Sequence, residues 1–170
     1  MSLNIIVCAK QVMDPETPLS AFNVDEAAKR VVPAQGIPPV VNGFCENAVE
    51  AALKIKEAAG DATITVISVG TDFVMDVMKK PLSMGADQMI LIQDPAAENL
   101  DALGTATVLS KAIEKIGEAD IVIFSDDGGI KDVIRLGESG NFYYRLDIPS
   151  YHTILIHSPL LVIHEIFLGN

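Results

Sequence analysis

The sequence predicts an α/β protein with a doubly wound, mostly parallel sheet. Strand-like apolar runs alternate with segments of helical periodicity along most of the chain. The first of these runs, residues 3–9, is almost entirely apolar, as expected of a strand buried on both faces. Right-handed crossovers between such strands place helices on both faces of a parallel sheet.

The N-terminal third holds one strand and one long connection. Residues 11–41 are rich in Pro, Asp and Ala, and a short hairpin is expected around Phe22-Asn23-Val24 and Arg30-Val31-Val32. Connections of this length inside a compact domain are usually functional or contact a partner.

The first helix is predicted to begin at Asn42-Gly43 and to end near Gly60. Its free backbone N–H groups and positive dipole end could hold an anion. The expected apolar face consists of Phe44, Ala48, Ala51, Ala52, Ile55 and Ala59.

The remaining elements continue the alternation. Strands are expected at 62–69, 88–92 and 120–124, and helices at 72–83, 100–116 and, weakly, 130–136. Pro81 should stop or kink the second helix near Lys79, because an internal proline costs about 3 kcal/mol. The apolar face of the 100–116 helix is expected to consist of Leu103, Ala106, Leu109, Ile113 and Ile116. Two last strands, 151–156 and 160–167, lack a helix between them and should pair as an antiparallel edge hairpin.

The composition limits the classes of function that the chain can have. With 170 residues, 49% of them hydrophobic, the chain is expected to form a single domain over residues 1–170. A net charge of −11 argues against nucleic acid as a partner. No run is long enough to span a membrane, and the start lacks the zones of a signal peptide, so a cytoplasmic protein with reduced Cys8 and Cys45 is expected.

In doubly wound sheets a ligand lies beyond the carboxyl ends of the strands, near the switch in strand order. The sequence places residues 8–10, 69–71 and 125–129 at these ends. The segment 42–45 can join them, because it begins the helix that follows the first strand.

At these positions the chain resembles the β-subunit of electron-transfer flavoproteins. The similar motifs are Lys10-Gln11-Val12 with Asp14, the run Asn42-Gly43-Phe44-Cys45-Glu46-Asn47-Ala48, Val69-Gly70, Met84-Gly85-Ala86-Asp87, Asp101 with Thr105-Ala106, and Ala119-Asp120. They occur in the family's order across residues 4–124.

The resemblance implies an adenine-nucleotide-hydrolase-like fold, a partner α-subunit that carries the main flavin, and a bound AMP or FAD, with AMP favoured. The implied cofactor contacts are Cys8, Asn42, Gly43, Phe44, Cys45 and Val69, with Ser125, Asp126, Asp127, Gly128 and Gly129 in the phosphate loop. It implies no independent catalytic residue. The sequence ends before the C-terminal arm that family members wrap around their partner, so the chain alone is expected to be colourless.

Each of these signals also has a purely structural interpretation. Asn42-Gly43 can be only a turn, the two cysteines only small buried hydrophobes, and residues 126–129 only a tight turn. The spacing of His152, His157 and His164 predicts no metal site, because odd offsets put His157 on the opposite face of a strand. The alternative function is a non-catalytic interaction domain that kept the fold and lost the nucleotide, and the alternative to an α-subunit partner is a homodimer.

Asp126 and Asp127 stand where the family has a basic residue and an amide. Each close carboxylate–phosphate pair costs about 1 kcal/mol in water, so we expect weak or absent AMP binding without metal and rescue by Mg²⁺. Asp126→Lys combined with Asp127→Gln should restore metal-free binding, measured by AMP titration of both proteins with and without Mg²⁺. Tight metal-free binding by the unmodified chain would show that the pair points away from the phosphate.

Overall fold

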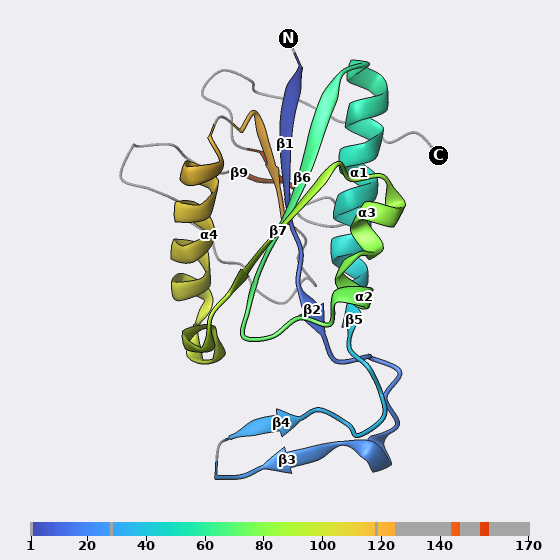
Figure 1. Cartoon of the computed structure of the whole chain (residues 1–170), viewed down its shortest axis with the longest axis vertical. Coiled ribbons are helices and arrows are strands. Elements are labelled where there is room, and N and C mark those ends of the chain that lie inside the picture. Colours follow the sequence, from blue (N-terminus) through green and yellow to red (C-terminus); the bar gives the residue numbers. More distant parts are fainter. Residues whose placement is uncertain (1, 28, 118, 125–143, 147–153, 157–170) are drawn as a thin grey trace.

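The centre of the protein is a four-stranded parallel sheet (Figure 1). The computed structural model describes residues 2–27, 29–117, 119–124, 144–146 and 154–156. The strand order is β7-β6-β1-β8, with β1 at Leu3–Cys8, β6 at Ala62–Gly70, β7 at Gln88–Gln93 and β8 at Ile121–Ile123. All four predicted parallel strands are therefore present, within one or two residues of the expected ends.

Helices cover both faces of this sheet, which confirms the doubly wound class (Figure 1). On one face lie α1 (Gly43–Ala59), α2 (Met75–Met78) and α3 (Lys80–Met84). On the other lies α4 (Ala102–Ile116), which follows the short helix η2 (Pro95–Asn99). The chain winds outward from β1 to β6 and β7 and then returns to place β8 on the other side of β1. The order of the strands therefore reverses at β1.

The side chains of β1 alternate between two cores. Ile5 and Val7 pack with α1, whereas Ile6 and Cys8 pack with Leu109 of α4. Each of the four is at most 9% exposed. This burial on both faces explains the nearly continuous apolar sequence of the strand.

Residues 11–41, here called the 11–41 ribbon, leave the carboxyl end of β1 and return to the start of α1. At the root, β2 (Gln11–Val12) pairs with β5 (Val40–Val41), and at the tip β3 (Asn23–Asp25) pairs with β4 (Arg30–Val32). Both pairs are antiparallel, and η1 (Leu19–Ala21) precedes the tip. The expected hairpin is confirmed, and Figure 1 shows it extending away from the sheet.

The predicted break in the second helix is also confirmed. α2 ends at Met78, and α3 begins at Lys80 with Pro81 in its first turn, where a missing N–H costs nothing. The helix begins later than residue 72, because Asp72 turns back to accept a hydrogen bond from the backbone N–H of Phe73 at 2.8 Å.

The apolar faces of the two long helices were predicted only in part. In α1 the buried residues are Cys45, Ala48, Val49 and Ala52, while Phe44 is 40% exposed. In α4 they are Ala106, Leu109 and Ser110, while Leu103 is 73% and Ile116 37% exposed. Leu103 lies in the first turn of α4. Apolar periodicity does not reveal how far the packing against the sheet extends along a helix.

The C-terminal hairpin differs from the expected one. β10 (Ile154–Ile156) lies within the predicted strand 151–156, but it pairs antiparallel with β9 (Tyr144–Leu146), a strand the sequence did not predict. This pair forms its own two-stranded sheet, and β10 lies near β8. The predicted helix 130–136 and strand 160–167 lie outside the described residues.

Aspartates satisfy the backbone at the amino edge of the sheet. Asp87 Oδ2 accepts from the backbone N–H of Ile64, and Asp120 Oδ2 accepts from that of Asn4, each at 2.8 Å. Asp87 precedes β7 and accepts from the neighbouring strand β6, whereas Asp120 precedes β8 and accepts from the neighbouring strand β1. The first N–H groups of a strand lie outside the ladder, so these carboxylates keep them paired.

Asp87 belongs to the Met84-Gly85-Ala86-Asp87 motif, and the structure gives physical reasons for Gly85 and Asp87 in that turn. Gly85 has φ +123°, and a Cβ there would lie 3.0 Å from Leu53 Cδ2. Asp87 Oδ2 also accepts from Lys56 Nζ at 2.7 Å. The hydrogen bond from Lys56, and then that from Ile64, hold the pKa of Asp87 below its usual value.

Asp87→Asn should lower the free energy of unfolding by about 1 kcal/mol, because it removes a charged acceptor from a half-exposed site. The pKa of Asp87 is lowered by folding, so its contribution is full above about pH 4 and is lost as pH falls below that value. Urea unfolding across this acid range should therefore show a flatter pH profile for Asp87→Asn.

The matched control is Asp76→Asn. Asp76 pairs with Lys79 across a 3.3 Å contact, and its side chain is 94% exposed. A profile in which Asp76→Asn flattens the acid response as much as Asp87→Asn would contradict the assignment.

Candidate functional site

The carboxyl edge of the sheet carries the candidate site, because the strand order reverses there at β1. Cys8 ends β1, and Val69 lies near the end of the neighbouring β6, where Cys8 is in register with Ile67. Both side chains belong to the core on the α4 face, in which Cys8 is 9% exposed. The structure thus brings these two predicted residues to the same edge and the same face.

Asn42 connects the start of α1 to this edge. Its backbone N–H donates to the carbonyl of Lys10, just past the end of β1, at 3.0 Å. Its side-chain Oδ1 accepts from the backbone N–H of Phe44 at 2.8 Å, as a helix N-cap does. The turn-and-cap interpretation of Asn42-Gly43 is confirmed, and the side-chain amide Nδ2 is the donor that this residue can offer a ligand.

The start of α1 is a weaker anion site than predicted. The N–H groups of Cys45 and Glu46 both donate to the carbonyl of Asn42, at 2.9 and 3.2 Å, and that of Phe44 donates to its side chain. A helix start attracts anions chiefly through unsatisfied N–H groups, and here the first turn satisfies most of its own. A phosphate would therefore need other donors.

The two cysteines are free and buried, as their interpretation as small hydrophobes predicts. Cys45 is 3% exposed and packs in the core on the α1 face. Burial, and then the nearby Cys45, raise the pKa of the Cys8 thiol far above its usual range. A thiol held protonated is a poor nucleophile and a poor metal ligand.

The predicted phosphate loop lies outside the described residues. β8 ends at Ile123, and Ser125, Asp126, Asp127, Gly128 and Gly129 follow Phe124 directly in sequence. The three histidines also lie outside. Within the described parts of the chain, no group of three or more His, Cys, Asp or Glu side chains could hold a metal ion.

Gln11 is a residue of this edge that sequence reasoning did not single out. Its Oε1 accepts from the backbone N–H of Val74 at 2.8 Å, and its Nε2 donates to the carbonyl of Asp72 at 3.4 Å. The side chain therefore joins the root of the 11–41 ribbon to the loop after β6. Its place in the Lys10-Gln11-Val12 motif was the available signal.

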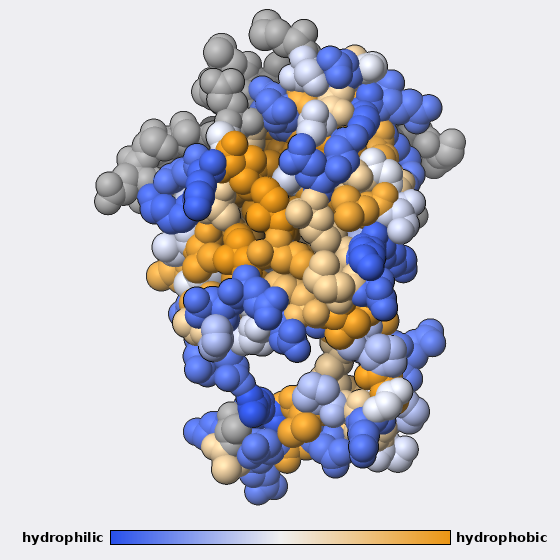
Figure 2. Space-filling view, in the orientation of Figure 1, coloured by the Kyte–Doolittle hydropathy of each residue, from blue (hydrophilic) through white to orange (hydrophobic). Residues whose placement is uncertain are grey.

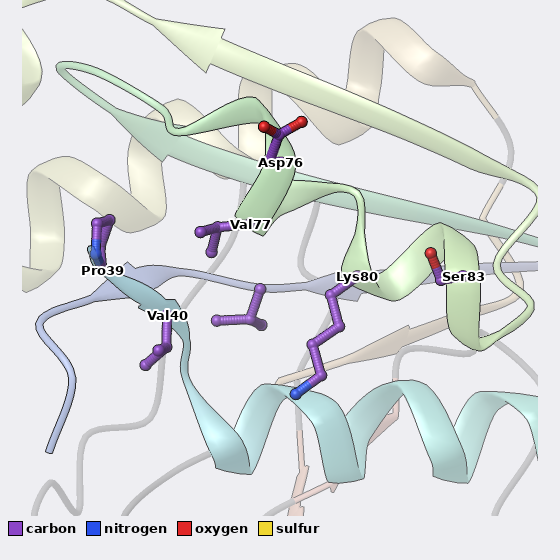
Figure 3. A pocket seen from close by; sticks show the side chains of 7 residues that line it. Pro39, Val40, Asp76, Val77, Lys80 and Ser83 are labelled. Carbon is purple, nitrogen blue, oxygen red and sulfur yellow. The ribbon is translucent and has the colours of Figure 1, made fainter. Parts of the chain in front are cut away.

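A separate open pocket of about 370 Å³ lies between the returning strand β5 and the helices α2 and α3 (Figure 3). Its lining is made of Pro39, Val40, Val41, Asp76, Val77, Lys80 and Ser83. Lys80 Nζ is engaged with Glu46 of α1 at 2.6 Å. None of the predicted cofactor contacts lines this pocket, so it is distinct from the carboxyl-edge site.

Comparison with known proteins decides the family. A sequence model described as the electron transfer flavoprotein domain matches residues 29–135. The chain belongs to this family. No helix among the described residues is long and apolar enough to cross a membrane.

Relatives agree with this assignment. The β-subunit of the electron transfer flavoprotein of Megasphaera elsdenii is 40% identical over 114 residues, which are 67% of this chain and 40% of the relative. That of Thermoanaerobacterium thermosaccharolyticum is 35% identical over 147 residues, 86% of this chain and 53% of the relative. The protein FixA of Azotobacter vinelandii is 34% identical over 116 residues, 68% of this chain and 39% of the relative. The chain thus spans about half the length, or less, of these relatives.

Gly43→Pro should raise the free energy of unfolding by about 0.5–1 kcal/mol. Gly43 is the first helical residue, whose N–H has no acceptor within the helix, and a Cβ there meets no atom within 4 Å. Asn42 has ψ 127°, the extended conformation that a residue before proline requires. Denaturant unfolding of the variant measures the change.

Gly60→Ala serves as the contrasting control. Gly60 ends the same helix with φ +78°, so this substitution should destabilise the protein by about 1 kcal/mol. A loss of stability in Gly43→Pro would mean that α1 does not begin with the geometry described.

Proposed function

We propose that this protein acts as a β-subunit-type component of an electron transfer flavoprotein and binds an adenine nucleotide at its carboxyl edge, AMP in preference to FAD. Family membership supports the electron-transfer role. The carboxyl edge supports the nucleotide, because the strand order reverses there.

The observation that carries the proposal is the 3.0 Å hydrogen bond between the Asn42 backbone N–H and the Lys10 carbonyl. It fixes the start of α1 against the end of β1, so the amide of Asn42 lies at the same edge as Cys8 and Val69. Three positions far apart in the sequence thereby lie at one edge of the sheet.

Different residues are assigned to the base, the ribose and the phosphate of the proposed nucleotide. We assign the base to the edge beside Cys8 and Val69, of which Val69 is only partly buried, and the Asn42 amide Nδ2 offers a donor to the base or the ribose. Most N–H groups in the first turn of α1 are engaged. We therefore assign the phosphate to the segment that begins at Ser125, with the exposed Lys10 as an additional cation at the edge.

A partner completes the proposed assembly. Three of the relatives are β-subunits or related components by name, one of them a subunit of a caffeyl-CoA reductase–Etf complex in Acetobacterium woodii. We propose that this chain likewise pairs with an α-subunit, and that the main flavin lies on that partner.

The direct test is nucleotide analysis of the purified protein after denaturation, together with an absorbance scan. After incubation with AMP and Mg²⁺ we expect AMP in the extract, and we expect no flavin absorbance from the chain alone. Flavin at about one per chain would place the main cofactor on this subunit. An absence of any nucleotide, also after incubation with AMP and Mg²⁺, would favour the interaction-domain alternative.

Asn42→Ala should weaken AMP binding by about 1–3 kcal/mol, the usual cost of an unpaired polar partner. This variant also removes the helix cap, which costs stability by itself. Asn42→Ser is the matched variant, since a serine hydroxyl keeps the cap but has no amide to donate. Calorimetry should therefore show weakened binding in both variants, but a clear loss of stability only in Asn42→Ala. Unchanged affinity in Asn42→Ser would move the ligand away from this side chain.

A further inference from the structure

We propose that two copies of this chain pair through the outer side of β7, the side that faces away from β6, so that their sheets join into one across a two-fold axis at Leu91. β7 stands at one end of the strand order β7-β6-β1-β8, and among the described residues it pairs with β6 alone. This interface is separate from the carboxyl-edge site, so it does not rest on the proposed nucleotide.

The outer side of β7 has none of the sequence features that usually keep an edge strand from pairing. Its six residues, Gln88-Met89-Ile90-Leu91-Ile92-Gln93, include no charged residue and no proline. Its register with β6 is continuous from one end to the other, so no bulge interrupts it. Edge strands that stay unpaired are commonly short, charged, bulged or broken by proline. The outer side of β7 is therefore suited to pairing with another strand.

Apolar surface lies on both sides of this strand. Met89 and Leu91 pack against the core under α1, and Ile90 packs against the core under α4, but all three are only partly buried. Figure 2 shows apolar side chains gathered in the middle of this face of the molecule, where Figure 1 draws β7 between α4 and α3. A second strand beside β7 would cover this surface together with the backbone.

A hydrogen bond at the end of β7 shows which of its residues point outward. The backbone N–H of Asp94, just past the strand, donates to the carbonyl of Gly70 in β6 at 3.1 Å. Along a strand, successive residues direct their N–H and C=O groups alternately to the two sides, so every second residue bonds the same neighbour. The backbone groups of Met89, Leu91 and Gln93 therefore point away from β6.

These three residues determine the register of the proposed pair. In an antiparallel pair about a two-fold axis at Leu91, this residue exchanges both backbone hydrogen bonds with its own copy, and Met89 exchanges them with Gln93 of the other copy. All three outward-facing residues are then paired. An axis at Ile90 would instead place Gln93 opposite Asp87, whose N–H is already bonded to β6.

Charge favours a second copy as the occupant. Two copies with a net charge of −11 repel each other over much of their surface, whereas the residues of β7 carry no charge. In the register about Leu91, Gln88 of each copy lies opposite Asp94 of the other. Asp94 Oδ1 accepts from the backbone N–H of Ala96 at 2.8 Å, so Oδ2 can accept from the opposing Gln88 amide. Each end of the pair thus joins an amide to a carboxylate, and no two carboxylates are directly opposed.

Disulfide cross-linking of the purified chain tests the register. Opposed residues of a hydrogen-bonded antiparallel pair have Cα atoms about 5.5 Å apart, a separation that a disulfide can bridge. Leu91→Cys should therefore cross-link to its own copy, and the two native cysteines are buried and do not compete.

Ile90→Cys is the matched control, because it also shortens a partly buried side chain of β7. In the proposed register it lies about 7–8 Å from its own copy, so it should cross-link at least about five-fold more slowly than Leu91→Cys. Equal cross-linking of the two variants, faster cross-linking of Ile90→Cys, or none in either would overturn the proposal.

Sedimentation equilibrium over a range of protein concentrations tests the contacts at the two ends of the pair. Gln88→Glu places a carboxylate opposite Asp94 twice, so it should raise the Kd of the dimer about four-fold or more, and Gln88→Lys should lower it by a similar factor. Both positions are exposed, so the fold does not depend on these side chains.

Thr107→Glu is the charge control, because it adds the same charge on the exposed face of α4. It should change Kd less than about two-fold. A chain that is monomeric at every concentration would overturn the proposal and assign the outer side of β7 to a different partner. A Kd that Gln88→Glu leaves unchanged, or that Thr107→Glu raises equally, would overturn it as well.

Discussion

The burial of β1 on both faces and both edges is the constraint on which the described structure depends. Its side chains divide between the core under α1 and the core under α4, and its backbone pairs with β6 on one side and β8 on the other. The helices can cover both faces only because the chain reverses its winding at this strand. The same reversal creates the carboxyl-edge site, so the core and the candidate site have one origin.

The two edges of the sheet differ in chemistry. At the amino edge, Asp87 and Asp120 pair with strand N–H groups, and Asp87 is further tied to Lys56. At the carboxyl edge, the corresponding positions carry small or amide-bearing residues, such as Cys8 and Asn42, instead of aspartates. Protein groups pair with the backbone at the amino edge, whereas the carboxyl edge keeps the Asn42 amide Nδ2 as a donor. The nucleotide proposed for the carboxyl edge would therefore leave the pairing at the amino edge intact.

The sequence predicted those structural features that depend on residues close to one another along the chain. The apolar and β-branched runs gave the four parallel strands, and Pro81 gave the break at Lys79. Asn42 and Gly60 gave the two ends of α1. The grouping of Cys8, Val69 and Asn42 followed from the general rule about the carboxyl edges of parallel sheets, with the family resemblance to support it.

Features that depend on distant partners could not be predicted in this way. The 73% exposure of Leu103 depends on how far along α4 the packing against the sheet extends. The bonds of Gln11 to the loop after β6, and of Arg30 to Glu98, join segments about 60 or more residues apart without any periodic signal. β9 is three residues long, too short for alternation to identify it. Asn42 was assigned to a ligand, and its side-chain oxygen proved to be used by the helix itself.

The placement of β8 beside β1 has a consequence for the order in which the protein is made. Translation proceeds from the N-terminus, so β1 and β6 leave the ribosome long before Ile121–Ile123 can pair with Ile5, Ile6 and Val7. Until then an apolar strand keeps one open edge, which invites pairing with other chains. Nascent chains that stall before β8 would therefore depend on chaperones, whereas chains released after it carry their own protection.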